Sequence, residues 1–209
     1  MSGTREPKRR EATIRRREDI LNAALTTFGS KGYKNGPLTE IAEQVDMTHA
    51  GILHHFGSKD QLLLEVLSYR DETDVADLEN QHIPNGLQLF HHLVKTAKLN
   101  MERPGIVQAY AVLSAEAVTD DHPARNYFQG RYSTLRVEVG EAFRVVCRER
   151  GGSDERAIEL GAAAILAVMD GLQVQWLLDP EAVNLGAATE FAIQSIFDAV
   201  LNPRESEFS

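Results

Sequence analysis

The chain has 209 residues, of which 43% are hydrophobic and 25% are charged, values close to those of ordinary soluble globular proteins. This composition excludes a largely disordered chain, and 15 Gly and 7 Pro without a repeating period exclude a collagen-like one. No apolar run approaches the ~20 residues that span a bilayer, and the N-terminal sequence lacks the apolar core of a signal peptide. We therefore expect a cytoplasmic protein without a membrane partner.

The net charge of −9 is unevenly distributed along the chain. Residues 1–59 hold 10 Lys/Arg against 7 Asp/Glu, whereas residues 60–209 hold 12 against 24. The excess of basic residues is largest in residues 1–17, with seven Lys/Arg against two Asp/Glu. This asymmetry favours a small basic module, suited to nucleic acid, on an acidic body. The alternative is a solvated basic tail that has no partner.

The sequence contains few features of a metal site or of an enzyme active site. Cys147 is the single cysteine, so no internal disulfide and no multi-cysteine metal site can form, and we expect an inert, buried thiol. The seven histidines contain no His-x-x-x-His pair that would place two ligands on one helix face. No phosphate-binding loop and no nucleophile motif is found. We therefore predict no catalytic residue, no metal site, no cofactor and no enzymatic activity.

Apolar residues recur at helical spacing almost throughout, and no convincing alternating strand occurs. Gly, Pro, Asn and Asp clusters separate nine segments, which predicts an all-α fold of about nine helices. The expected organisation is a disordered basic arm (1–12), a small N-terminal helical domain (13–60), a larger helical domain (61–202) and a tail (203–209). The first helix is expected to span roughly 13–30 and to end at Gly32, and Ser153 is expected to cap the helix that begins at 154.

The segment from Pro37 to Phe56 carries the most information about function. It reads as two helices of about eight residues joined by a short turn, with Thr39 and Thr48 as their N-caps, which is the pattern of a helix-turn-helix. An ordinary helical hairpin is the alternative. Seven residues are candidates for DNA contact, at the start of the recognition helix or next to phosphates: Thr39, Thr48, His49, Ala50, Gly51, His54 and Lys59. Among these, Thr48 or Ala50 suits a thymine methyl, and His49 suits guanine N7 or O6.

Arg17 to Leu64, which include the run LTEIAEQVDMTHAGILHHFGSKDQLL, resemble the DNA-binding domain of the tetracycline-repressor (TetR) family. The later run MDGLQVQWLLDPEAV, from Met169 to Val183, is similar to one regulatory branch of that family. The resemblance implies that residues 13–60 are a helix-turn-helix DNA-binding domain and that residues 61–202 are a helical ligand-binding and dimerisation domain. It implies a homodimer that binds a double-stranded operator through two major grooves. It also implies a small-molecule effector, of unknown identity, that changes operator affinity.

Two positions depart from the family pattern. Asp46 stands where family members commonly carry a turn glycine, but Asp adopts the left-handed conformation at modest cost, so we expect the turn to survive. His54 stands where a phosphate-contacting tyrosine is usual. A phosphate contact from His54 would depend on pH, because imidazole titrates between pH 5 and 8.

Two further sets of residues follow from helix faces in the acidic body. Polar and aromatic residues on otherwise apolar faces are candidates for an effector pocket, with ordinary core packing as the alternative: Phe90, Met101, Tyr110, Phe128, Tyr132, Gln173 and Trp176. Apolar residues on the last two helices are candidates for a four-helix dimer interface, with closure of the monomer core as the alternative. They are Leu160, Ala164, Val168, Leu172, Phe191, Ile193, Ile196, Phe197 and Val200.

The sequence thus predicts a ligand-released repressor that acts as a homodimer on a palindromic operator. The alternative from another class is an all-α small-molecule-binding protein or enzyme that does not bind DNA. Salt-sensitive, sequence-selective duplex binding distinguishes the two. The effector, the operator and the regulated genes do not follow from the sequence.

Overall fold

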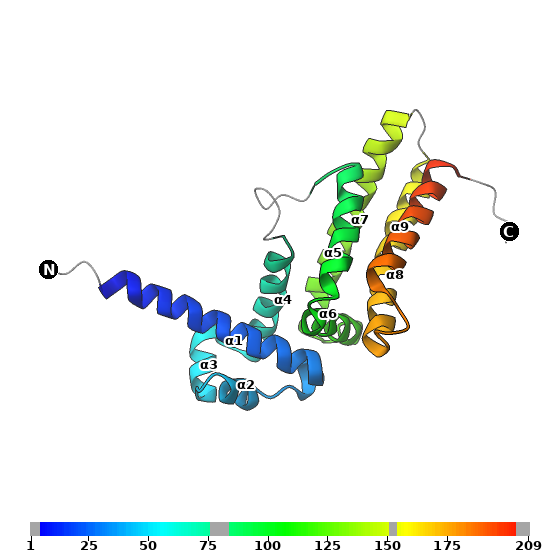
Figure 1. Ribbon diagram of the computed structural model, residues 1–209. Helices are drawn as coiled ribbons and strands as arrows, with labels where there is room; N and C mark the ends of the chain where they lie inside the picture. Colours follow the sequence, from blue (N-terminus) through cyan, green and yellow to red (C-terminus); the bar gives the residue numbers. More distant parts are fainter. Residues whose placement is uncertain (1–4, 76–83, 151–153, 204–209) are drawn as a thin grey trace. The chain divides into compact units, whose positions relative to one another are not determined.

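A computed structural model describes residues 5–75, 84–150 and 154–203. Within these ranges the chain forms nine α-helices and no strand, which confirms the all-α prediction (Figure 1). The bounds of the helices are α1 Arg5–Asn35, α2 Leu38–Gln44, α3 His49–Phe56, α4 Lys59–Val75, α5 Leu87–Asn100, α6 Pro104–Glu116, α7 Arg125–Arg150, α8 Glu155–Leu178 and α9 Leu185–Leu201.

Helix α1 is longer than the sequence pattern predicted. It begins at Arg5, so residues 5–12, expected as part of a disordered arm, continue the first helix instead. Arg, Lys, Glu and Ala, which dominate this stretch, all favour helix, and Pro7 falls in the first turn, where a proline is tolerated. At the other end Gly32 takes φ 74° and ψ 171°, the positive φ expected of it, but a last helical turn follows up to Asn35.

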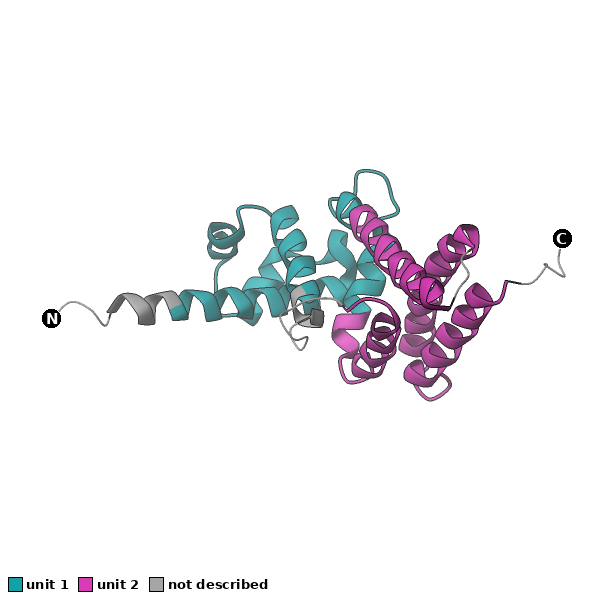
Figure 2. Ribbon diagram, turned by 90° about the horizontal axis from the view of Figure 1, so that it is seen from above, with its two compact units in different colours: residues 1–73, 108–127 teal, residues 74–107, 128–209 magenta. Residues whose placement is uncertain are grey.

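The chain divides into two compact units, shown in teal and magenta in Figure 2. Unit 1 comprises residues 1–73 and 108–127, and unit 2 comprises residues 74–107 and 128–209. The expected boundary at residue 60 is therefore displaced. Most of α4 and the C-terminal part of α6 belong to the same unit as the helix-turn-helix. Helix α6 approaches α1 closely there, because a Cβ added at Gly29 would lie only 3.0 Å from the Cα of Ala109.

The core of unit 2 is built on three phenylalanines from three helices. The ring of Phe90 lies with its centroid 4.6 Å from that of Phe143 and 5.1 Å from that of Phe197. Ile158 and Ile165 of α8 are fully buried in the same cluster, together with Cys147, whose burial raises the pKa of its thiol. Non-directional apolar packing of this kind supplies most of the stability of a helical domain.

Helix α8 qualifies the expectation that no segment could cross a bilayer. By length and apolar composition alone it could span a membrane. Its Ile158, Ile165 and Met169 are buried against the other helices of unit 2, as in the core helix of a globular domain. Asp154 is the N-cap of the helix, and its side chain accepts a hydrogen bond from the N–H of Ala157 at 3.2 Å. Ser153, the expected cap, lies outside the described residues.

Candidate nucleic-acid interface

Helices α2 and α3 meet through their apolar faces across a tight turn. Ile41 and Ala42 of α2 and Ile52 and Phe56 of α3 are buried, which leaves the opposite face of α3 exposed. Asp46, in the turn, takes φ 51°, so the left-handed conformation predicted for it is confirmed. Two short helices in this arrangement, the second with an exposed face, form a helix-turn-helix.

The caps of the two helices differ from each other. The Thr48 side chain accepts a hydrogen bond from the N–H of Gly51 at 3.1 Å, which confirms the predicted cap of α3. The predicted cap of α2 is wrong: Pro37 is the N-cap and makes no side-chain bond, and Thr39 lies in the first turn. Pro at this point supplies a fixed φ near the start of the helix, so no side-chain acceptor is needed for the chain to turn.

The residues proposed to contact DNA are accessible to a ligand. Thr39, Thr48, His49, Ala50 and His54 are exposed, and Gly51 and Lys59 are half-buried. Thr48, His49 and Ala50 are consecutive at the N-terminal end of α3, where a recognition helix presents side chains to base edges. Lys59 begins α4, and Thr39 stands in the first turn of α2, two positions next to helix N-termini that suit phosphates.

Two arginines of α1 fix the ends of these short helices, and the sequence pattern did not single out their contacts. Arg16 donates to the carbonyl of Val45, after the end of α2, at 3.0 Å. Arg17 donates to the carbonyl of His55, near the end of α3, at 3.0 Å, and its guanidinium lies 4.4 Å from the centroid of the Phe56 ring. Arg17 also pairs with the carboxylate of Glu65 on α4. Basic residues at the last carbonyls of a helix are favourable partners, so these contacts stabilise and orient α2 and α3.

The seven candidates for an effector pocket do not form one cluster. Tyr132 donates a hydrogen bond to the carboxylate of Asp170 at 2.5 Å, and the centroid of its ring lies 6.5 Å from that of Phe128. Trp176 packs with Val107 and Leu185 in a separate apolar cluster. The positions of the remaining candidates are as follows: Phe90 in the phenylalanine core, Gln173 buried on α8, Met101 partly exposed after α5, and Tyr110 in unit 1 under the guanidinium of Arg70.

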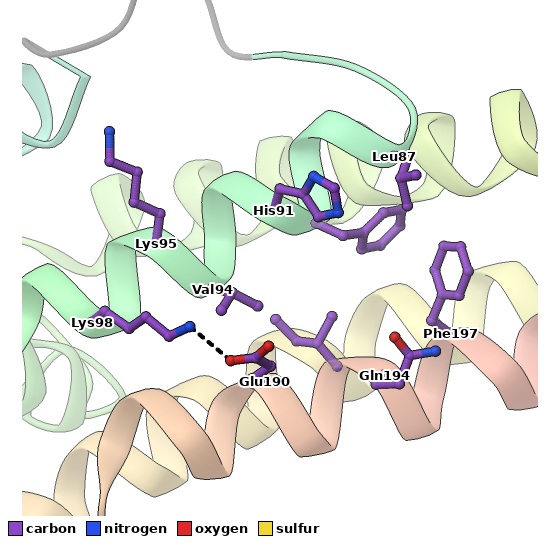
Figure 3. Close-up of a pocket in the computed structure, with 10 residues that line it drawn as sticks. Leu87, His91, Val94, Lys95, Lys98, Glu190, Gln194 and Phe197 are labelled. Carbon is purple, nitrogen blue, oxygen red and sulfur yellow. Dashed lines mark hydrogen bonds and ion pairs between the residues drawn. The ribbon is translucent and has the colours of Figure 1, made fainter.

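A groove of about 470 Å³ lies in unit 2 between α5 and α9. Val94 of α5 and Phe197 of α9 contribute apolar side chains to its lining, and Figure 3 shows the ion pair between Lys98 and Glu190 nearby. The two charged groups are 2.7 Å apart. Of the seven candidates for effector binding only Phe90 lines this groove. Tyr132 and Asp170 are not among the residues that line it.

The residues expected at a dimer interface separate into two groups. Leu160 and Phe191 are 61% and 75% exposed, while Ala164, Val168 and Leu172 are half-buried. Ile193, Phe197 and Val200 lie in the core of unit 2, with Ile196 packed against it, so within one chain these four close the core. These four residues lie on the face of α9 that packs on α5 and α8. Phe191 lies on the neighbouring face of the helix, which is exposed.

Comparison with known proteins agrees with this geometry. Residues 20–66 match the sequence profile of bacterial regulatory proteins of the tetR family, and residues 88–199 match that of the C-terminal part of BetI-type transcriptional repressors. A probable HTH-type transcriptional regulator, ArpR of Pseudomonas putida, is 27% identical over 182 residues, which are 81% of this chain and 83% of ArpR.

Two solved structures share the fold. NalD, the secondary repressor of the MexAB-OprM multidrug efflux pump in Pseudomonas aeruginosa, has a TM-score of 0.66 at 17% identity and covers 92% of this chain and 98% of its own. A putative transcriptional regulator from Saccharomonospora viridis, solved in complex with choline, has a TM-score of 0.65 at 20% identity and covers 90% of this chain and 96% of its own.

The fold and the exposed recognition helix define a helix-turn-helix DNA-binding transcriptional regulator. The chain belongs to the TetR family, and its C-terminal part is of the BetI type. The relatives that the chain matches are transcriptional regulators. This finding favours a DNA-binding regulator over the alternative of a helical protein that does not bind DNA.

Proposed function

We propose that this regulator represses transcription as a cytoplasmic homodimer, by binding a palindromic operator from which a small-molecule effector releases it. The observation that carries the DNA contact is the exposed N-terminal end of α3, where Thr48, His49 and Ala50 stand opposite the buried Ile52 and Phe56. Small side chains at Ala50 and Gly51 would let the helix backbone approach the groove floor. In the dimer, two copies of α3 would read major grooves about 34–36 Å apart.

Selection of bound duplexes from a random library, followed by a salt titration of the winner, tests this proposal. We expect an inverted repeat and an affinity that falls steeply with salt. His49→Ala should relax selection at one base pair of each half-site, at about 1–3 kcal/mol per contact, without changing the salt slope. Glu43→Gln, an exposed substitution on α2, is the matched control. No enrichment at low salt, with and without candidate effectors, would contradict the proposal.

The proposed dimer interface is the exposed apolar surface of α8 and α9. Leu160 and Phe191 are accompanied there by the exposed Val174 and Leu178 of α8, whose spacing places an apolar stripe along the helix. Contiguous exposed apolar surface of this kind is typical of an interface between chains. We expect Phe191→Glu to convert a dimer of about twice the 23.2 kDa chain mass into monomers, as measured by light scattering.

Val137→Glu provides the matched control for the interface, because Val137 is a 65% exposed apolar residue on α7. It should remain dimeric at the concentration at which Phe191→Glu dissociates. A wild-type chain that is monomeric at micromolar concentration would contradict the dimer, and a dimeric Phe191→Glu would contradict the position of the interface.

For the effector we favour a small organic cation. Residues 60–209 carry 24 acidic against 12 basic residues, and the Tyr132–Asp170 pair, with Phe128 beside it, combines a carboxylate with aromatic rings. The choline complex of the Saccharomonospora viridis regulator supports the same class. Choline should therefore release the operator at lower concentration than its neutral isostere 3,3-dimethylbutanol, and Asp170→Asn should weaken this preference. Equal release by the two compounds would contradict recognition of the charge.

A further inference from the structure

The corner between α1 and α2 is held by a carboxylate from α6. The N–H of Tyr33 donates to one carboxylate oxygen of Glu116 at 2.7 Å, across 83 residues of sequence. The other carboxylate oxygen of Glu116 lies against Gly32, where an added Cβ would clash with it. Since Gly32 also takes a positive φ of 74°, only glycine fits this contact without movement. Glu116 therefore fixes the last turn of α1 where it leaves the helical conformation.

Tyr33 connects the last turn of α1, which Glu116 fixes, to the start of α4. Its hydroxyl donates to Asp60, and its ring lies under the ammonium of Lys59, 4.6 Å from the ring centroid. The Lys59 ammonium also reaches the carbonyl of Lys34 at 3.5 Å. The Lys59 ammonium therefore contacts residues 33 and 34, the segment that the hydrogen bond to Glu116 fixes. Burial lowers the pKa of Lys59, and the nearby carboxylates of Asp60 and Glu116 oppose that shift, so the site keeps a cation in a defined place.

His122 completes the surroundings of Glu116. Its Nδ1 accepts a hydrogen bond from the N–H of Ala124 at 3.2 Å, which leaves the proton on Nε2 in the neutral ring. Nε2 faces Glu116 at 3.8 Å, and the imidazole packs edge-to-face against the Tyr33 ring at 5.4 Å. The last turn of α6 therefore contacts the backbone of Tyr33, and the segment after it contacts the Tyr33 ring.

We propose that Glu116 is a positioning residue for DNA binding, which sets the place of Lys59 by fixing Tyr33. The inference rests on the proposed contact between Lys59 and an operator phosphate. Glu116 does not touch DNA in this scheme and lies outside the helix-turn-helix. Helix α6 begins in unit 2 and ends, with Glu116, in unit 1, so operator affinity depends on the position of the last turn of α6.

The test compares Glu116→Ala, Glu116→Gln and Lys59→Gln on the selected operator, over a range of salt concentrations. Lys59→Gln should weaken binding and lower the log–log salt slope by about one per subunit. Glu116→Ala should weaken binding about tenfold and lower the slope in the same way, because the Lys59 ammonium loses its fixed place. Glu116→Gln keeps an acceptor oxygen for the Tyr33 N–H and should restore most of the affinity.

The double variant Glu116→Ala/Lys59→Gln separates positioning from a general loss of stability. If Glu116 acts through Lys59, the double variant binds no more weakly than Lys59→Gln alone. Glu190→Ala, which breaks the Lys98 ion pair in unit 2, is the matched control and should bind DNA as the wild type does. Additive losses in the double variant, or wild-type binding by Glu116→Ala, would overturn the inference while Lys59→Gln still weakens binding. Wild-type binding by Lys59→Gln would instead overturn the phosphate contact on which the inference rests.

Discussion

The ends of the short helices α2 and α3 in unit 1 and the long helices of unit 2 are fixed by different kinds of contact. In unit 1, polar side chains reach backbone groups far away in sequence, as when Arg16 and Arg17 donate to the carbonyls of Val45 and His55. In unit 2, longer helices pack through large apolar side chains, such as Phe90, Phe143 and Phe197. Hydrogen bonds are directional, whereas apolar packing is not.

The lengths of the helices account for this difference. Helices α2 and α3 have 7 and 8 residues, too few for an isolated helix to be stable in water, yet α3 must keep a fixed orientation for its side chains to meet base edges. Directional contacts to their ends provide that orientation. Helices α7 and α8 have 26 and 24 residues and obtain their stability from buried area. We therefore expect substitutions at the polar contacts to the ends of α2 and α3 to change recognition more than stability, and those in the core of unit 2 to do the reverse.

The largest effect on stability is expected from Phe143→Ala. Phe143 is fully buried among the other two phenylalanines, so its truncation should lower the free energy of unfolding by about 3–5 kcal/mol. Urea unfolding measures this loss, and Val137→Ala on the exposed face of the same helix should change stability by no more than about 0.5 kcal/mol. A loss below about 1 kcal/mol for Phe143→Ala would contradict the assignment of the core.

Arg17→Gln is expected to lower the affinity for the operator while changing the stability little. Its guanidinium is partly exposed, and we expect only a small loss of stability from an ion pair of this kind. The His55 carbonyl and the Phe56 ring lose their partner, however, so α3 should lose its fixed orientation and the specific operator affinity should fall about tenfold.

The control for Arg17→Gln is Arg15→Gln, an exposed neighbour on α1. Fluorescence anisotropy on the operator and on a scrambled duplex distinguishes the two variants. Arg17→Gln should lower the ratio of specific to non-specific affinity, whereas Arg15→Gln should leave that ratio unchanged. An unchanged ratio in both variants would show that the Arg17 contacts do not orient α3.

Local signals explain what the sequence could predict. The Thr48 cap and the left-handed Asp46 depend on neighbouring residues, and the structure agrees with both. The contact between Tyr33 and Glu116 depends on a fold that brings together residues 83 apart, and no periodicity contains that information.

The apolar residues of α9 show a second reason why packing could not be predicted from the sequence. Helical spacing identified Phe191 and Phe197 as apolar surface, but it could not show which neighbour covers each stripe. The structure places Phe197 against α5 and α7 and leaves Phe191 exposed. A helix with apolar residues on more than one face is ambiguous in this way, because periodicity defines a face and not its partner.

A pH dependence of stability is expected in unit 1 from His122. Burial lowers the pKa of its imidazole below the usual value, and the carboxylates of Glu116 and Asp60 oppose this shift only in part. The folded chain therefore binds fewer protons at this site than the unfolded chain, so the stability is fully present above about pH 6.5 and falls as the pH drops. Urea unfolding at pH 7.5 and 5.5 should show a smaller loss for His122→Gln than for the wild type, and equal losses would contradict this assignment.

The smallest expected effect concerns DNA binding and His54. His54 is exposed near the end of α3, where the family pattern places a phosphate-contacting tyrosine, and its imidazole can donate a hydrogen bond to a phosphate. His54→Ala should therefore weaken operator binding about threefold, whereas His54→Gln, whose amide also donates a hydrogen bond, should keep most of the affinity. Wild-type binding by His54→Ala would exclude a phosphate contact at this position.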